Sequence, residues 1–342
     1  MVNDLKSYTS VQRGLTLIEI MISLVIGSVL VAGAGKIFIS SKRNVETQLN
    51  LQQIQENARY ALDLICRDLR RAGYFGGLNS ITAIEGTSAP LEPTGKCPPG
   101  NAWGRMLARP VFGLNDTNAD YACITDSDYL QGDIIVTRYA NPLAKTAPLS
   151  DKQLYLRSNS STGALFTGSE SDSNQITEPA MVQKIIAHAY YIRPSTTLCP
   201  DGSNPPALWR ETLGSNGRPV AEELVTGVEQ LQLRYGVADF NPDDDLNSDG
   251  TSYRYVDADN VTKSEWNASF DSASEWREWV ELTSNSTVHS AVVLARVWLL
   301  VRAACAEPLL TNRRTYSMGS YNYAVNDHFR RQLYSTTVHL RN

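Results

Sequence analysis

A long apolar run near the amino terminus is the first strong pattern of the chain. Residues 15–35 read LTLIEIMISLVIGSVLVAGAG, about 21 residues that span roughly 32 Å as a helix. This length is enough to cross a bilayer, it exceeds the apolar core of an ordinary signal peptide, and no small-residue cleavage site follows it. The run therefore predicts a membrane-spanning helix that persists in the mature protein.

A second helical pattern follows directly. Apolar residues recur at intervals of three and four over residues 51–72, with polar and charged residues between them. This spacing predicts an amphipathic segment, 36–72, that continues the first helix and packs its far half against a sheet. Gly73, Gly76 and Gly77 are expected to end it.

The remainder of the chain has runs typical of strands, separated by segments rich in Gly, Pro, Asn and Ser. The expected strands are 133–139, 153–157, 182–192, 224–235, 288–302 and 328–340. Long polar stretches at 77–127, 158–179, 195–219 and 239–287 are interpreted as surface insertions. The run SAVVLARVWLLVR at 290–302 is expected to be a central strand, although its length would also suit a helix. The predicted fold class is α+β, with a long helix packed on an antiparallel sheet body over 73–342.

One acidic residue, Glu19, interrupts the apolar run. A carboxylate at mid-membrane costs about 2.5–3.5 kcal/mol on translocon scales, so we expect a compensating partner. The stretch GLTLIE at 14–19 resembles the type IV prepilin processing motif, in which a Gly cleavage position precedes an apolar run with Glu at its fifth residue. The resemblance implies that a prepilin peptidase removes a leader, 1–14, by cutting between Gly14 and Leu15, and methylates the new amine. Leu15 stands where the family usually has Phe.

The new amine would account for Glu19. Cleavage places an α-amino cation four residues from a carboxylate in a low-dielectric setting, where opposite charges attract strongly. If the amine belongs to a neighbouring subunit, the contact repeats along a screw axis and builds an open filament. Glu19 is thus expected to dock subunits together. The alternative is an interfacial residue of a plain membrane anchor.

Blocks outside the anchor resemble the PilW family of type IV pilus minor pilins: ICRDLRRAGYFGG at 65–77, LQLRYGV at 231–237, ARVWLLVRA at 295–303 and RRQLYSTTVHLRN at 330–342. The resemblance implies a pilin-like fold and a place in the minor-pilin complex that primes assembly and sits at the filament tip, supporting twitching motility or adhesion. It implies as partners the prepilin peptidase, other minor pilins, the major pilin, an adhesin-like tip protein and the inner-membrane assembly platform. A minor pseudopilin of a type II secretion system, which uses the same anchor, is the alternative.

Location also follows from the resemblance, because the basic residues on the two sides of the span do not decide the orientation. It places the leader in the cytoplasm, one helix in the bacterial inner membrane and the body in the periplasm, and later the subunit at the pilus tip on the cell surface. The net charge of -5 argues against a surface that binds phosphates. We therefore expect no nucleic-acid partner.

An acidic segment at 243–250 contains the spacing D-x-N-x-D-G of an EF-hand-like calcium loop. Side-chain oxygens stand at its first, third and fifth positions, and a backbone carbonyl at the seventh. The twelfth position carries Val256 in place of the usual Glu. Because of this departure, the favoured interpretation is an acidic surface turn without an ion, and the alternative is a calcium ion that orders the loop. The expected ligands are Asp245, Asn247, Asp249, Thr251 and Asp257.

The five cysteines lack C-x-x-C spacing, which argues against zinc ribbons and thioredoxin-type motifs. A periplasmic body would favour disulfides. Cys97 with Cys123 is the first pairing, because they flank a loop of about 25 residues. Cys199 with Cys305 is the second. Cys66 lies on the amphipathic helix and is expected to be a buried free thiol.

Catalytic motifs are missing from the sequence. It contains no G-x-S-x-G, no H-E-x-x-H and no Gly-rich phosphate loop. The four histidines are isolated, and His188 and His339 fall in apolar or alternating strands, where structural roles are commoner than acid-base chemistry. We therefore expect a structural protein and no enzymatic activity.

Overall fold

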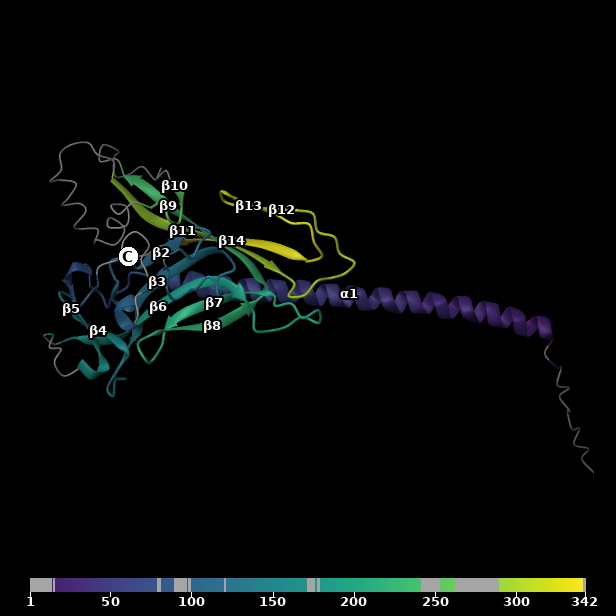
Figure 1. Cartoon of the computed structure of the whole chain (residues 1–342), viewed down its shortest axis with the longest axis horizontal. Coiled ribbons are helices and arrows are strands. Elements are labelled where there is room, and N and C mark those ends of the chain that lie inside the picture. The colour runs from purple at the N-terminus through teal and green to yellow at the C-terminus, as the bar shows by residue number, and fades with distance from the viewer. Residues whose placement is uncertain are drawn as a thin grey trace, which may run out of the picture. The chain divides into compact units, whose positions relative to one another are not determined.

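The computed structural model describes residues 14, 16–78, 81–88, 97, 100–119, 121–170, 176, 179–240, 253–261 and 289–340. The chain divides into two compact units, residues 1–52 and 53–342. A long helix, α1 (Leu17–Arg71), runs through both units, and the second unit is built mainly of antiparallel strands (Figure 1). A long apolar amino-terminal helix with an antiparallel sheet domain confirms the predicted α+β, pilin-like class.

The second half of α1 buries one stripe. Its fully buried apolar residues include Ala58, Ala61, Ile65 and Leu69, spaced three or four apart so that they share one face. The helix stops before Gly73, whose φ of 87° is left-handed. The helix therefore ends where the sequence predicts.

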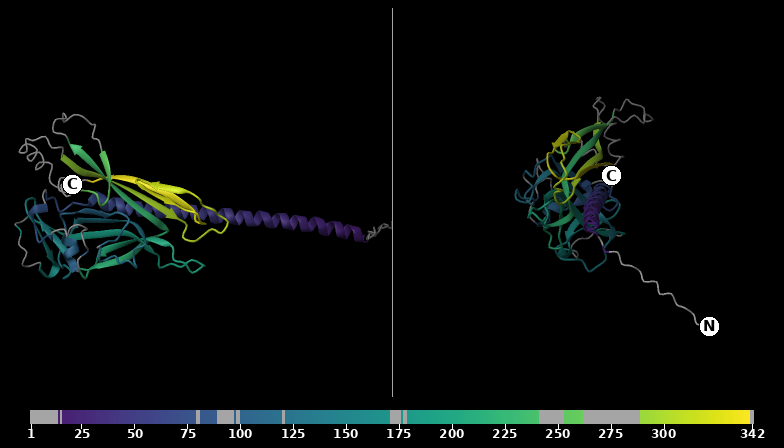
Figure 2. Two further views of the ribbon diagram at one scale, coloured as in Figure 1. Left: turned by 45° about the horizontal axis from the view of Figure 1, so that its top comes forward. Right: turned by 90° about the vertical axis from the view of Figure 1, so that its right-hand side faces the viewer.

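The described strands form three sheets (Figures 1 and 2). The eight-stranded sheet has the order β1-β5-β4-β6-β3-β2, with β7 paired to β6 and β8 paired to β7; only the short β1–β5 pair is parallel. Its strands are β1 (Ile84–Glu85), β2 (Val111–Leu114), β3 (Gln131–Ala144), β4 (Leu154–Ser158), β5 (Gly163–Thr167), β6 (Met181–Pro194), β7 (Pro206–Leu213) and β8 (Pro219–Thr226).

The four-stranded sheet has the order β10-β9-β11-β14 and is antiparallel throughout. Its strands are β9 (Val228–Phe240), β10 (Tyr253–Asp257), β11 (His289–Arg302) and β14 (Arg331–His339). A hairpin of β12 (Thr315–Met318) and β13 (Tyr321–Ala324) forms the third sheet. Three short 3-10 helices complete the described elements: Ile81–Ala83, Gly100–Arg105 and Gly168–Glu170.

The main core lies between α1 and one face of the two larger sheets. Leu69 of α1, Ile135 of β3, Tyr190 of β6, Leu233 of β9 and Val297 of β11 belong to one buried cluster. Strands from both sheets therefore pack on the same helix segment. Burial of this apolar surface is the main force that holds the helix to the body.

Two smaller cores lie on the opposite faces of the sheets. Ile134 and Tyr191, each one residue from a member of the main core, point to the other side of the eight-stranded sheet, as the pleat requires. They pack there with Trp103, which is fully buried. On the four-stranded sheet, Trp298 and Met318 pack together beneath the β12–β13 hairpin.

The four expected surface insertions are each wrong in part. The stretch 77–127 contains β1 and β2, 158–179 contains β5, 195–219 contains the well-buried β7, and 239–287 contains β10. These strands are short and sit between turn residues, so their burial comes from tertiary packing that local polarity does not reveal. The expected strand 224–235 is also split, because Gly227 turns the chain at a φ of 90° between β8 and β9. The run 290–302 is a strand, as expected.

Candidate assembly site on the long helix

The amino terminus of α1 is closed by a capping box. The amide of Glu19 donates a hydrogen bond to Thr16 Oγ1 at 3.3 Å, and the amide of Thr16 donates to Glu19 Oε2 at 3.5 Å. These reciprocal contacts satisfy two backbone donors that the helix itself leaves unpaired. The position of Glu19 in the first turn also places its negative charge at the positive end of the helix dipole.

The Glu19 carboxylate can nevertheless accept further hydrogen bonds. Its contacts to Thr16 are long, and both side chains are exposed. A charge-assisted hydrogen bond to a cation is shorter and about twice as strong as a neutral one. Gly14 is exposed as well, with nothing within 4 Å of where a Cβ would stand, whereas Leu15 and residues 1–13 lie outside the described residues.

The segment after Glu19 is apolar and uncovered by the rest of the chain. Within the described residues α1 is long and apolar enough to cross a membrane, and none of its apolar window is buried. The hydroxyls of Ser23 and Ser28 donate to the carbonyls of Glu19 at 2.7 Å and Val25 at 2.8 Å. These hydroxyls are therefore satisfied inside the helix. Glu19 is the only ionisable side chain of residues 17–35.

A buried polar cluster, here called the Asp68 cluster, fixes α1 to the body. Asp68 accepts hydrogen bonds from the hydroxyls of Tyr139 at 2.8 Å and Tyr190 at 2.6 Å, and pairs with His188 Nδ1 at 2.5 Å. Asp68 is 5% exposed and His188 8% exposed. The neighbouring strands β3 and β6 thus both bind one carboxylate of the helix.

The hydrogen bonds of the Asp68 cluster favour the ionised carboxylate. Burial by itself would raise the pKa of Asp68, but the hydrogen bond and charge of His188, together with the two tyrosine hydroxyls, outweigh burial and hold the pKa below its ordinary value. Asp68 therefore stays charged at neutral pH. This buried charge makes the attachment of the helix specific, because any other position of α1 on the sheet would leave the Asp68 carboxylate without hydrogen-bond donors.

A second ion-pair network ties β14 to the start of β9. Arg331 donates to both carboxylate oxygens of Glu229, at 2.5 and 2.8 Å, and the Arg331 side chain is 1% exposed. Asp327 pairs with the same guanidinium at 2.6 Å, and Arg302 lies 3.7 Å from Glu229. The planar, forked guanidinium of Arg331 can bind one carboxylate along each of two edges, and here it binds Glu229 and Asp327. The first residues of the block 330–342 therefore have a structural role.

The disulfides join Cys97 to Cys123 and Cys199 to Cys305, with Cα–Cα distances of 5.6 and 5.7 Å. These are the two pairs considered from the sequence. Cys66 is free and buried.

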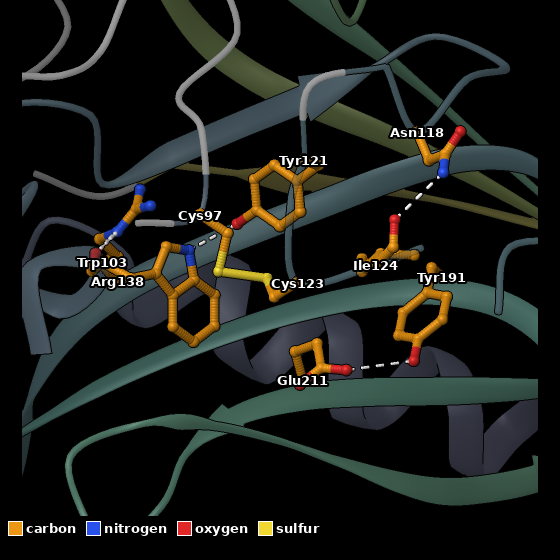
Figure 3. The surroundings of a disulfide bond; sticks show 9 residues. All are labelled: Cys97, Trp103, Asn118, Tyr121, Cys123, Ile124, Arg138, Tyr191 and Glu211. Carbon is orange, nitrogen blue, oxygen red and sulfur yellow. Dashed lines mark hydrogen bonds between the residues drawn. A yellow bond between two sulfur atoms is a disulfide. The ribbon is translucent and has the colours of Figure 1, made fainter. Parts of the chain in front are cut away.

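The Cys97–Cys123 bond lies in the smaller core that contains Trp103 and Tyr191, beside aromatic side chains (Figure 3). Trp103 donates its indole N–H to the Tyr121 hydroxyl at 2.5 Å, and Arg138 Nε donates to the Trp103 carbonyl at 2.9 Å. The disulfide therefore fastens a segment that already covers one face of the eight-stranded sheet.

Most of the expected calcium ligands, Asp245, Asn247, Asp249 and Thr251, lie outside the described residues. Asp257 is described, and its Oδ1 pairs with Arg234 Nε at 2.9 Å and accepts from the Ser320 hydroxyl at 2.8 Å. In the part of the chain that the structure describes, no group of three or more His, Cys, Asp or Glu could hold a metal ion. The calcium site stays a prediction from the sequence.

Sequence reasoning did not single out Asp68. The signal was present, because Asp68 stands on the buried stripe of the helix, between Ile65 and Ala72, where a carboxylate needs a partner. His188 was expected to be structural, and it is the residue that pairs with Asp68. The pair was not predictable because 120 residues separate its members.

Comparison with known proteins bears on both ends of the chain. Residues 9–35 match the family model described as Prokaryotic N-terminal methylation motif, which includes Gly14, Leu15 and Glu19. Residues 189–342 match the model described as Type IV Pilus-assembly protein W. The comparisons with curated proteins and with solved structures give no match. The two family matches identify the chain as a type IV pilin of the PilW family.

Proposed function

We propose that this pilin is a minor subunit of the type IV pilus, which joins the tip complex and helps to initiate assembly. The observation that carries the proposal is the exposed Glu19 carboxylate, the only ionisable side chain of the apolar residues 17–35, which lie within the match to the methylation motif. The body attached to that helix matches the PilW family. Membership of this family indicates a structural protein, and the proposal assigns it no enzymatic activity.

Processing is the first step of the proposed role. A prepilin peptidase removes residues 1–14 by cutting between Gly14 and Leu15 and methylates the amine of Leu15. The exposure of Gly14 and the open space around it are compatible with access to this bond. The cut leaves a cationic amine one residue before the Thr16 cap. There the amine adds positive charge to the positive end of the helix dipole, which is unfavourable unless an anion compensates it.

Docking is the second step. In the proposed filament, Glu19 of one subunit receives the amine of its neighbour, which replaces the long contacts to Thr16 by a charge-assisted hydrogen bond. The apolar side chains around Glu19 are exposed in the single chain. Covered by neighbouring helices in the proposed filament, they keep water away from this contact and strengthen it. Because the amine and the carboxylate are different groups, one subunit can donate to one neighbour and accept from another, so that the contact can propagate along a filament.

The proposed location follows the same order of segments. Residues 15–35 span the inner membrane once, 36–72 continue the helix, and 73–342 form a periplasmic body that later reaches the pilus tip at the cell surface. The two disulfides of the body support an oxidising compartment. The proposed partners are the prepilin peptidase, the inner-membrane assembly platform, the major pilin, other minor pilins and an adhesin-like tip protein.

The test is deletion of the gene and complementation with wild-type, Glu19→Gln and Ser23→Ala chains. Ser23 is the matched control, because it lies one turn along the helix from Glu19 and its hydroxyl is satisfied within the helix. We expect deletion and Glu19→Gln to abolish surface pili and twitching, and Ser23→Ala to restore both. Full piliation with Glu19→Gln would refute the role of Glu19, and a defect confined to exoprotein secretion would assign the chain to a type II system.

A further inference from the structure

Strand β14 is an unusual edge. In the described part of the four-stranded sheet it pairs only with β11, and Figure 2 shows it as the long carboxyl-terminal strand of that sheet. Its nine residues make it longer than β10, the other edge, which has five. Six consecutive residues, 333–338, read LYSTTV and contain no charge and no proline.

The other long edge of the body is built differently. Strand β8 pairs only with β7 among the described strands, and it carries Glu222 and Glu223 in its middle. Soluble proteins protect exposed edges with charges, proline or bulges, because an open edge recruits other strands. Strand β8 has such charges and the middle of β14 has none, so β14 is the edge suited to a partner strand.

The backbone register shows which groups β14 offers. Leu340 donates its N–H to the carbonyl of Val293 at 3.0 Å, in register with the pairs between β11 and β14. Since alternate residues of an antiparallel strand face its partner, every second residue counted back from Leu340 turns toward β11. The residues between them turn N–H and C=O toward the free edge: Leu333, Ser335, Thr337 and His339.

Helix α1 flanks the inner face of β14 and carries positive charge there. Burial raises the pKa of the Tyr334 phenol, and the nearby Arg59 cation acts against this rise. Burial likewise raises the pKa of the Cys66 thiol, and Arg70 and a hydrogen bond with Thr336 act against it. Arg59 and Arg70 are exposed and lie on one flank of the helix.

Two acidic side chains lie on the same side of the helix, Glu56 and Asp63. Asp63, which also acts on the Cys66 thiol, pairs with Arg67 at 3.0 Å. Because Arg59, Arg67 and Arg70 outnumber these two carboxylates, the flank beside β14 keeps an excess of positive charge in a chain whose net charge is -5. A strand added to β14 would place every second side chain near these arginines, so carboxylates in that strand would be favoured.

We propose that β14 accepts an extended, acidic strand from another subunit of the pilus, which extends the four-stranded sheet beside Arg59 and Arg70. Backbone hydrogen bonds to the free edge provide affinity, and the arginines select for carboxylates. The inference deepens the proposed function, on which it rests, by naming the surface that binds a neighbour. Pairing between the β14 strands of two copies is unfavourable, because it would bring the arginines of both copies together, so the proposed partner is a different subunit.

The test compares substitutions at Thr337 in the full-length chain, expressed in the deletion strain. Thr337→Pro removes one outward N–H at a position where an edge strand tolerates proline, and Thr337→Ala removes the side chain but keeps the N–H. We expect at least a tenfold loss of the Pro variant from sheared pili and less than a twofold loss of the Ala variant. The double charge reversal Arg59→Glu with Arg70→Glu leaves the edge intact and is also expected to reduce incorporation about tenfold.

Folding is checked in the same cells. A folded variant keeps both disulfides and keeps Cys66 closed to thiol reagents. A folded Thr337→Pro chain that enters pili at the wild-type level overturns the proposal, and so does equal loss of the Ala and Pro variants. If the Pro chain does not fold, the charge-reversal variant decides in its place, and wild-type incorporation of that variant overturns the proposal.

A photo-crosslinking residue identifies the partner. Placed at Thr337, it is expected to form an adduct with a different pilin-type subunit, whereas at the exposed Val220 of the β8 edge it is expected to form none. The inference is overturned if Thr337 forms no adduct, or if its adduct is with a second copy of this chain or with a protein outside the pilus. If deletion of the gene leaves piliation intact, the proposed function has failed, and the crosslink still decides whether β14 pairs with a pilin-type subunit.

Discussion

The substitution Asp68→Asn is expected to loosen the attachment of α1 to the body. Asp68 is a buried carboxylate with three donors, Tyr139, Tyr190 and His188. Hydrogen bonds to charged groups contribute about 1.5–3 kcal/mol each, and removing one member of a buried charged pair costs about 3–5 kcal/mol. Because asparagine keeps part of the bonding, we expect the free energy of unfolding to fall by about 3 kcal/mol.

Cys66 provides the assay, because this buried free thiol lies two residues from Asp68 on the same helix. A loss of about 3 kcal/mol raises the open population, and hence the labelling rate of Cys66, by about 100-fold where closing outpaces labelling. The measurement is the rate of thiol modification of the full-length protein in detergent at neutral pH, alongside a urea unfolding curve.

Asp63→Asn is the matched control for Asp68→Asn. It is the same change on the same helix, at an exposed carboxylate paired with Arg67 at 3.0 Å, and is expected to cost about 0.5 kcal/mol or less. Equal labelling rates in the two variants would refute the reasoning. The pKa of Asp68 lies below its ordinary value, so its contribution to stability is present at neutral pH and is lost as the pH falls through that lowered pKa.

Two further predictions concern the body. Burial raises the pKa of Glu211 to about 7 from 4.5. The contribution of Glu211 to stability is therefore complete below pH 4.5 and falls by about 3 kcal/mol as the pH rises to 7, at 1.36 kcal/mol per pH unit. Glu211→Gln should remove this part of the pH dependence of the urea midpoint, and an unchanged pH dependence would contradict the prediction. The disulfides close loops of 26 and 106 residues, for which the chain-entropy model gives about 3.5 and 4.8 kcal/mol. Replacing Cys199 and Cys305 by serine should therefore lower the unfolding free energy more than replacing Cys97 and Cys123, and the reverse order in denaturant curves would count against this model.

The sequence sufficed for those features that repeat or are local. The period of three and four in residues 51–72 matches the buried stripe of α1, and Gly73 ends the helix as expected. Strands β3 and β6 are readable as apolar runs, because each strand is long and packs against a core on both faces. Local chemistry of this kind does not depend on distant contacts.

The features that failed depend on tertiary contacts. Strand β7 was taken for a surface insertion, since short strands between turns carry little periodic signal. The partners of Asp68 come from β3 and β6, so that only the folded chain brings them together. The edge position of β14 also depends on the order of strands in the sheet, which no local pattern encodes.

The mass of the mature amino terminus tests the central claim most directly. The protein is isolated from pilus-bearing cells, digested, and its amino-terminal peptide measured by mass spectrometry. The account predicts that the peptide begins at a methylated Leu15, with residues 1–14 gone. A peptide that still contains the leader, or that begins at any other residue, would contradict it.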